Sequence, residues 1–322
     1  MSFLHARRHI IMSVLELQDE TAFAAAVEPH RRELQLHCYR MLGSFDESED
    51  LTQETFLRAW RRRETYAGRA SVRAWLYKIA TNACLDALEK RPREPSPEGE
   101  VAWLQPYPDE RLEAGPDEAV VDRETIELAF LIAIQHLPPR PRAVLILRDV
   151  LGWRAKDAAD LLDTSVAAVN SALQRARAVL KEHLPHERGE WTAAGSAQER
   201  VLLERYIAAT EAGDAAGLKA LMHEEARFMM PPEPGVWRGR ENIVAAWLSG
   251  GFGTDEMGAF RLLATRANRQ PALANYLRKP GDDAYRALAI DVLRVEGGRV
   301  TDIITFGPSV FATFGLPSTL GE

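Results

Sequence analysis

Residues 161–180 read LLDTSVAAVNSALQRARAVL, and their spacing predicts the end of one helix, a turn and a second, longer helix. Apolar residues recur at intervals of three and four, which places them on one face of a helix over about residues 166–184. These residues are Val166, Val169, Leu173, Ala176 and Leu180. A shorter helix is expected over residues 155–162. Two helices joined by a short turn, the second one longer, form a helix-turn-helix, a motif that binds DNA.

The opposite face of the longer helix carries small and hydrogen-bonding side chains. Ala167 and Ala168 permit a close approach to a groove, and the donors beside them can reach phosphates or base edges. We therefore expect DNA contacts from Thr164, Ser165, Ser171, Gln174 and Arg175. An ordinary antiparallel helix pair would have the same pattern.

Helices are also expected upstream and immediately downstream of this motif, and a different pattern begins near residue 198. Helical spacing covers residues 20–90, with breaks near Gly43 and Gly68, and returns over 123–137 and 141–151. Beyond residue 198, helices over 198–213 and 215–222 precede strands over 226–230, 259–268, 272–278, 285–295 and 299–306. A two-residue hairpin turn is expected at Gly297-Gly298. This order predicts an α+β domain with a curled antiparallel sheet.

The net charge of −7 over 322 residues is distributed unevenly. Residues 92–124 carry three basic and ten acidic side chains, whereas residues 1–91 and 125–189 are slightly positive. Six prolines in 92–124 disfavour regular helix, so we expect an extended acidic linker there. Trp103, Leu104 and Tyr107 are unusual in a solvated spacer and indicate that the linker docks on another part of the protein.

A second asymmetry lies within the first block. Residues 44–57 hold five acidic and no basic side chains, whereas residues 58–78 hold seven basic side chains and one acidic. Aromatic residues are interleaved with the basic run. This combination indicates two adjacent binding surfaces, one acidic and one suited to nucleic acid, although two solvated helix faces would have a similar composition.

Composition also excludes several classes of protein. Two cysteines are too few for a disulfide framework or a four-cysteine zinc site, so we expect a reducing cytoplasm, no metal and no cofactor. No apolar run approaches the roughly 20 residues of a membrane span, and the N-terminus lacks the apolar core of a secretory signal. Both Met1 and Met12 are available as translation starts.

Three stretches resemble known families. HCYRMLGSFDESEDLTQETFLRAWRR (37–62) with YAGRASVRAWLYKIATNACLDAL (66–88) resembles the second conserved region of bacterial sigma factors of the extracytoplasmic-function (ECF) type. LPPRPRAVLILRDVLGWRAKDAADLLDTSVAAVNSALQRARAVL (137–180) resembles their fourth region. MPPEPGVWRGRENIVAAWL (230–248) and the final strands resemble the SnoaL-like branch of the NTF2-like fold.

The resemblance implies a multidomain chain. It would have an all-α region 2 over 13–91, the acidic linker over 92–124, an all-α region 4 over 125–186 ending in the helix-turn-helix, and an α+β NTF2-like cone over 198–322. It further implies that the protein directs core RNA polymerase to the −10 and −35 elements of promoter DNA and initiates transcription.

In the family, the acidic helix of region 2 binds the clamp helices of the polymerase β′ subunit, and the β subunit is a further partner. Carried over by motif, the residues for β′ are Asp46, Glu49, Asp50, Gln53 and Glu54. The basic segment resembles the part of region 2 that opens the −10 element, where aromatic rings replace base stacking. Its implied DNA contacts are Tyr66, Arg69, Ser71, Arg73, Trp75, Asn82 and Asp86.

Two further implications concern the linker and region 4. The linker of the family threads a positively charged cleft of the polymerase. Many family members have a basic residue directly after the position of Ser171, where this sequence has Ala172, which leaves phosphate anchoring there in doubt.

The C-terminal domain leaves a regulator and an enzyme as alternatives. The resemblance implies an apolar pocket, and its expected lining is Phe228, Met230, Trp237, Trp247, Tyr276 and Phe306. A small-molecule ligand of unknown identity is therefore a further expected partner. Catalysis needs a carboxylate or histidine with a perturbed pKa in that pocket, and Asp291 has no partner at a diagnostic spacing. We expect no enzyme, but a domain that regulates the sigma regions in cis. A DNA-binding regulator that acts without polymerase remains a further alternative.

Overall fold

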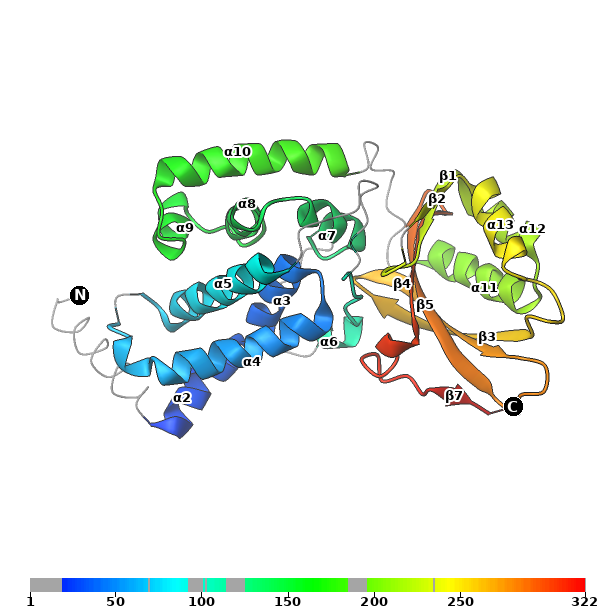
Figure 1. The fold of residues 1–322 in the computed structure, drawn as a ribbon, viewed down its shortest axis with the longest axis horizontal. Coiled ribbons are helices and arrows are strands. Elements are labelled where there is room, and N and C mark those ends of the chain that lie inside the picture. The colour runs from blue at the N-terminus through cyan, green and yellow to red at the C-terminus, as the bar shows by residue number, and fades with distance from the viewer. Residues whose placement is uncertain are drawn as a thin grey trace. The chain divides into compact units, whose positions relative to one another are not determined.

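The computed structural model describes residues 19–68, 70–91, 101, 103–113, 125–184, 196–233 and 235–321. The chain forms two compact units, one of Met1–Glu94 with Ala133–Leu184 and the other of Pro95–Ile132 with Pro185–Glu322 (Figure 1). The first unit is helical, and the second contains the sheet. No described helix is long and apolar enough to cross a membrane.

The helical unit begins with helices α2 (Glu20–Val27), α3 (Arg31–Leu42), α4 (Phe45–Arg61) and α5 (Val72–Lys90). A 3₁₀ turn, η1 (Glu28–His30), separates α2 from α3, because Pro29 has no N–H to continue the helix. Gly43 ends α3 with a left-handed φ of +72°. Ser44 then caps α4 by accepting a hydrogen bond from the Glu47 amide at 3.3 Å.

The second group of helices is α7 (Leu128–Gln135), α8 (Pro139–Leu145), α9 (Ala155–Leu161) and α10 (Val166–His183), with a π-helical turn, η4 (Ile146–Val150), after α8. Helices α9 and α10 form the expected helix-turn-helix. The buried stripe of α10 contains Val169, Leu173 and Ala176, but Val166 is 41% exposed and does not belong to it. Val166 is the first residue of the helix, next to its cap, where the turn holds it away from the core.

Within this unit, helix α8 packs against α3 and α5. Arg142 of α8 is buried and donates to the Met41 carbonyl at 2.5 Å, at the end of α3. It also donates to the carbonyls of Gln135 and Leu137 at 2.8 and 2.9 Å. The last carbonyls of a helix have no hydrogen-bond donor within the helix. The Arg142 guanidinium donates to such carbonyls at the ends of α3 and α7. Burial lowers the pKa of Arg142 to about 9.

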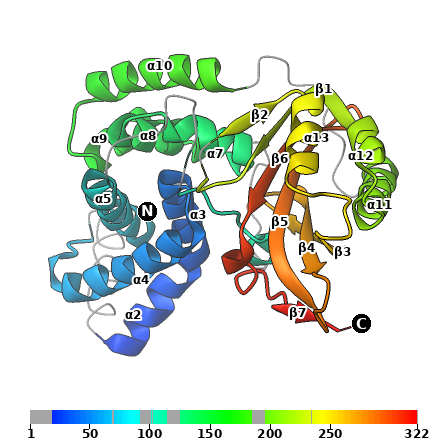
Figure 2. The same ribbon diagram turned by 45° about the vertical axis from the view of Figure 1, so that its right-hand side comes forward.

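The second unit contains a sheet of strands β1 (Met222–Met229), β2 (Val236–Arg238), β3 (Ala259–Ala267), β4 (Gln270–Arg278), β5 (Tyr285–Glu296), β6 (Arg299–Phe306) and β7 (Thr319–Leu320). The strand order is β2-β1-β6-β5-β4-β3, and β7 pairs with β5. Helices α11 (Ala197–Glu211), α12 (Ala215–Leu221) and α13 (Arg240–Ser249) cover one face (Figure 2). The core between them includes Tyr206, Ile243, Leu273 and Ile303.

The expectation of an antiparallel sheet is wrong at one pair of strands. Strand β1 pairs with β6 in parallel, with Phe228 opposite Ile303, whereas the other pairs are antiparallel. A parallel pair needs a long crossover, and the chain between β1 and β6 supplies one that includes α13. The two-residue turn at Gly297-Gly298 is confirmed, with φ of +53° and +74°.

A buried histidine lies between α3 and α5 of the helical unit. The His37 side chain is fully buried, and its Nε2 and the Thr81 hydroxyl lie 2.9 Å apart. Burial, with a smaller contribution from Arg40, lowers the pKa of His37 to about 3. His37 is therefore neutral in the folded protein across the pH range in which an exposed histidine becomes charged.

His37 is expected to make the helical unit sensitive to acid. In the unfolded chain, His37 binds a proton below about pH 6.5, whereas in the folded protein it stays neutral down to about pH 3. The free energy of unfolding is therefore unaffected by His37 above pH 6.5 and decreases as the pH falls from 6.5 toward 3. Each pH unit in that interval should cost about 1.4 kcal/mol of unfolding free energy. Urea unfolding followed by helical circular dichroism measures it. His37→Gln should flatten the slope, whereas His223→Gln, at an exposed position, should not. Equal slopes for all three proteins would contradict the assignment.

Candidate nucleic-acid and protein interfaces

Helix α4 presents an acidic surface on the helical unit. Asp46, Glu49, Asp50 and Gln53 are exposed. Glu54 is partly buried and accepts a hydrogen bond from Arg58 Nε at 2.8 Å, which lowers the pKa of its carboxyl. The acids near the start of α4 also lie at the positive end of its dipole, which favours them there. The five residues predicted for polymerase binding are therefore on one helix, four of them open to solvent.

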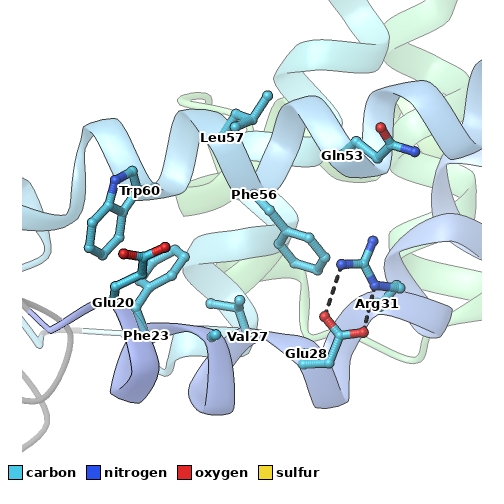
Figure 3. A pocket seen from close by; sticks show the side chains of 10 residues that line it. Glu20, Phe23, Val27, Glu28, Arg31, Gln53, Phe56, Leu57 and Trp60 are labelled. Atoms are coloured by element: carbon cyan, nitrogen blue, oxygen red, sulfur yellow. Dashed lines mark hydrogen bonds and ion pairs between the residues drawn. The ribbon is translucent and has the colours of Figure 1, made fainter.

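An apolar groove lies beside this surface, between α2 and α4 (Figure 3). Its volume is about 410 Å³. Phe23 and Trp60 meet edge to face with ring centroids 5.1 Å apart, and Leu57 is 50% exposed at the rim. Arg31 closes one end through a two-pronged ion pair with Glu28, at 2.7 and 2.9 Å. Sequence reasoning missed this groove, because its two walls are separated by α3 in the chain.

The aromatic segment before α5 is folded onto itself. Tyr66 is buried, its hydroxyl donates to the Ala70 carbonyl at 2.7 Å, and its ring lies 5.1 Å from that of Trp75. Ser71 caps α5 by accepting from the Ala74 amide at 3.2 Å. The structure thus brings three of the predicted DNA residues together at the start of α5. Arg69 lies outside the described residues.

The remaining predicted DNA residues of region 2 lie along α5. Arg73 is bound to Glu33 of α3, with Nε 2.7 Å from Oε2. Asn82 is exposed. Asp86 is also exposed and accepts a hydrogen bond from Arg58 at 3.1 Å. Arg73 and Asp86 are therefore engaged in ion pairs, which a DNA contact would have to replace.

The helix-turn-helix exposes the residues predicted to contact DNA. Thr164, Ser171, Gln174 and Arg175 are exposed on or just before α10. Ser165 is exposed as well, but its hydroxyl caps α10 by accepting from the Ala168 amide at 3.1 Å. Ser171, Gln174 and Arg175 lie on the face of α10 opposite its buried stripe, as a recognition helix requires, and Thr164 and Ser165 directly precede the helix.

The linker residues described by the structure belong to the unit that contains the sheet. Val101, Leu104 and Tyr107 are buried. Asp109–Glu113 form a short helix, α6, so the expectation of a purely extended linker is wrong there. The segment can turn into a helix at that point because no proline lies between Pro108 and Pro116. The prediction that this part of the linker docks is confirmed for Tyr107, which is bound to Asn268. Leu104 is buried and Trp103 is partly buried.

The turn between β3 and β4 holds this linker. Asn268 and Arg269 both have left-handed φ, +56° and +59°. The Asn268 amide donates to the Tyr107 carbonyl, and the Tyr107 amide donates to Asn268 Oδ1, both at 2.8 Å. Asn268 Nδ2 donates to the Ile126 carbonyl at 2.8 Å. One buried asparagine therefore binds the linker at Tyr107 and the chain just beyond the linker at Ile126.

Charged groups reinforce the same attachment. Asp109 of the linker is buried and accepts from the Arg269 amide at 2.7 Å and from Arg266 Nε at 3.3 Å. Arg266 also binds Glu199 of α11, at 2.8 Å. Burial raises the pKa of Asp109, although its partners act in the opposite direction. The linker, the sheet and α11 thus share one ion-pair network.

The six residues predicted to line a pocket lie on two faces of the sheet. Phe228 lies near Trp237 and Trp247, with ring centroids 5.3 and 5.6 Å apart, on the helix-covered face. Met230 packs against the same core. Tyr276 and Phe306 lie on the opposite face, since successive residues of a strand alternate and their neighbours Asn275 and Thr305 face the helices. Tyr276 instead meets Phe311 at 5.2 Å, so these two residues do not share a lining with the other four.

Asp291 of β5 lies on the helix-facing side. Thr305 Oγ1 donates to it at 2.5 Å, and Asn275 Nδ2 donates at 2.9 Å. Burial raises the pKa of Asp291, and these two hydrogen bonds act against the rise. The neighbouring strands therefore supply the partners that the sequence spacing did not reveal. Among the described residues, no group of three or more histidine, cysteine or acidic side chains could hold a metal ion.

Comparison with protein-family models agrees with this division of the chain. Residues 26–94 match sigma-70 region 2, residues 128–180 match sigma-70 region 4, and residues 203–303 match the SnoaL-like domain. An acidic helix, an aromatic basic segment and a helix-turn-helix on one chain define a transcription initiation factor of the sigma class.

Comparison with individual proteins identifies the family. The chain is 43% identical to the ECF RNA polymerase sigma factor SigG of Mycobacterium tuberculosis (strain H37Rv), over 98% of this chain and 91% of that one. It is 28% identical to SigJ of the same strain, over 85% of this chain and 88% of that one. The crystal structure of M. tuberculosis SigJ superposes with a TM-score of 0.62 at 25% identity, covering 92% of this chain and 99% of SigJ.

This chain belongs to the ECF family of RNA polymerase sigma factors. Proteins of this family bind core RNA polymerase and promoter DNA in transcription initiation, and they are regulators without catalytic activity of their own.

Asn268→Gly is expected to release the linker without straining the turn, because glycine adopts the left-handed φ freely. The variant removes the side-chain bonds to Tyr107 and Ile126, so amide hydrogen exchange in residues 101–113 should become about tenfold faster or more. Hydrogen–deuterium exchange with mass spectrometry measures the change. Arg269→Gly is the matched control at the next position of the turn, and an equal effect of both variants would contradict this role of Asn268.

Proposed function

We propose that this protein directs core RNA polymerase to promoters with −10 and −35 elements, and that its SnoaL-like domain regulates this activity in cis by holding the linker between the two sigma regions. The observation that carries the second part is the binding of the linker backbone by Asn268. Such a factor acts where the chromosome is transcribed, in the bacterial cytoplasm.

The acidic surface of α4 is the proposed polymerase site. Its exposed carboxylates complement a basic partner, and charge complementarity sets the orientation and rate of encounter. The apolar groove beside them supplies area for desolvated contact with the same partner helix. The proposed contacts to the β′ clamp helices are Asp46, Glu49, Asp50, Gln53 and Glu54. Region 4 is proposed to contact the β subunit.

Two surfaces are proposed for promoter DNA. The segment at the start of α5 opens the −10 element, where Trp75 offers a ring for an unstacked base, the buried Tyr66 packs against that ring, and Arg69 and Arg73 neutralise phosphates. Ser71, Asn82 and Asp86 complete this set. The −35 element is read by Thr164, Ser165, Ser171, Gln174 and Arg175, whose side chains are exposed on α10 or directly before it.

The linker connects regulation to these surfaces. The family resemblance implies that the linker occupies a cleft of the polymerase, yet Tyr107 is buried and bound to Asn268 of the SnoaL-like domain. One segment cannot occupy both places, so capture by the domain competes with the polymerase and lowers activity. We assign no reaction to the domain. Its four aromatic and apolar residues on the helix-covered face remain the proposed place for a small-molecule ligand.

Reversing charge on α4 should weaken polymerase binding. Glu49→Lys with Asp50→Lys places like charges against a basic partner, which we expect to raise the Kd for core RNA polymerase about tenfold or more. Fluorescence anisotropy with labelled sigma factor measures the Kd. Glu89→Lys, at an exposed position near the end of α5, is the control and should leave it nearly unchanged. An unchanged Kd for the double variant would exclude this surface.

Promoter-specific transcription tests the whole proposal. Purified core polymerase with this chain should transcribe from its own promoter, and the chain without polymerase should not open that DNA. A DNA-binding regulator that acts alone would fail to support any transcript. Because deletion of the SnoaL-like domain would remove the partners of Tyr107, the point variant Asn268→Gly is the sharper test of regulation. It should raise transcript yield about threefold or more relative to Arg269→Gly, since each of the two lost hydrogen bonds is worth about a factor of three. Equal yields would exclude regulation through linker capture.

A further inference from the structure

The groove between α2 and α4 has an apolar surface that is partly open to solvent. Its α2 wall contains Phe23 and Val27, which are buried. On its α4 wall, Phe56 and Trp60 are partly exposed, and Leu57 is 50% exposed. Its volume of about 410 Å³ lies in the range of pockets that bind ligands. An apolar occupant would therefore gain burial here on both walls.

Two carboxylates stand at the two ends of this groove (Figure 3). Glu28 is bound to Arg31 at one end. Glu20 lies at the other end, beside Phe23 and Trp60, where it is exposed and has no ion-pair partner among the described residues. The groove thus fits an apolar segment that carries a cation opposite Glu20.

A segment with this pattern precedes the groove in the same chain. Residues 3–11 read FLHARRHII and lie outside the described residues. The apolar residues nearest to Arg7 are Phe3, Leu4, Ile10 and Ile11, each three or four positions away from it. In a helix, residues at these intervals lie on one side. The spacing therefore predicts an apolar face with an arginine at its centre, which is how amphipathic helices enter grooves.

The segment also has the right charge and the right reach. It contains two arginines and no acidic residue, whereas the neighbouring surface of α4 exposes carboxylates. Residues 12–18 join it to α2 and can span up to about 23 Å. Helix α2 has eight residues and is about 12 Å long, so the tether reaches along its whole length.

We propose that residues 3–11 bind the α2–α4 groove of the same chain in the free protein, with Arg7 at Glu20, and restrain the binding of core RNA polymerase to the acidic surface of α4. The restraint rests on the proposed function, which assigns the same groove to the polymerase, whereas the contact within the chain does not. A segment in the groove and a polymerase helix exclude each other.

The tether makes even a weak contact effective. A segment joined by a short linker competes at an effective concentration of about 1 mM. With an intrinsic Kd of about 0.1 to 1 mM, it would leave the groove open in about one tenth to one half of the molecules. The apparent Kd for polymerase would then be about two- to tenfold higher than without the segment. Polymerase can still displace a competitor of this strength.

Cross-linking in the free, full-length protein tests the contact. The photoreactive residue p-benzoylphenylalanine replaces Ile10, and the products are separated by size and mapped by mass spectrometry. We expect monomers in which position 10 is joined to residues 20–31 or 53–60, the walls of the groove. Cross-linked dimers would show that a second copy supplies the segment, and monomers joined elsewhere or not at all would leave the groove to the polymerase. Each of these results would overturn the proposal.

A charge swap tests the pairing of Arg7 with Glu20. In the cross-linking protein, Arg7→Glu should lower the yield of groove products about threefold or more, because it replaces an attraction by a repulsion. Adding Glu20→Arg should restore the yield, whereas adding Glu89→Arg, at an exposed position of α5, should not. A yield that Glu20→Arg fails to restore would overturn the pairing.

Polymerase binding tests the restraint. Arg7→Gln should lower the Kd for core RNA polymerase about two- to tenfold, as measured by fluorescence anisotropy. The control is His9→Gln, which changes the opposite side of the predicted helix and should leave the Kd unchanged. Equal Kd values for both variants would overturn the restraint. The cross-link needs no polymerase, so it can form when the proposed function fails, and transcription with core polymerase can succeed when the cross-link does not form.

Discussion

The hydrogen bonds of Asn268 are the interaction on which the arrangement of the second unit depends. A linker segment that buries apolar side chains must also bury peptide groups, and each of those groups needs a partner. Asn268 supplies partners from its backbone and its side chain together, because the left-handed turn directs both toward Tyr107 and Ile126. Arg266 and the Arg269 amide compensate the buried carboxylate of Asp109 beside it. The linker is thereby part of the sheet unit.

Carboxylates have three different roles in this chain, and the net charge distinguishes none of them. On α4, the carboxylates of Asp46, Glu49 and Asp50 are exposed, and we assign them to a basic partner. Asp109 is buried and attaches the linker to the sheet unit. Asp163 is exposed, but it is paired with Lys78 of α5, whose Nζ lies 2.7 Å from Asp163 Oδ1. The physical difference is the surroundings of each group, since an exposed carboxylate keeps its hydration and a buried one must be paired.

The sequence predicted the helices of both sigma regions well, because their apolar residues recur at helical intervals and glycine or proline marks their ends. It also predicted the Gly297-Gly298 hairpin, whose turn chemistry is local. The parallel pairing of β1 with β6 was not predictable, since no local signal indicates which of two strands separated by about seventy residues will be neighbours. Tyr276 and Phe306 were assigned to the pocket because they are aromatic, but the alternation of side chains along a strand places them on the other face.

For the proposed sites, the sequence predicted which residues take part and on which helices they lie. Which side chains surround them was visible only in the folded structure. The sequence by itself determined the family, the acidic and basic surfaces of region 2 and the exposed face of α10, because each depends on spacing within one helix or loop. Tertiary structure alone decided that α2 completes a groove with α4, that Asn268 holds the linker and that Asp163 meets Lys78. These contacts join residues 37 to 161 positions apart, and only chain folding brings such residues within hydrogen-bonding or packing distance.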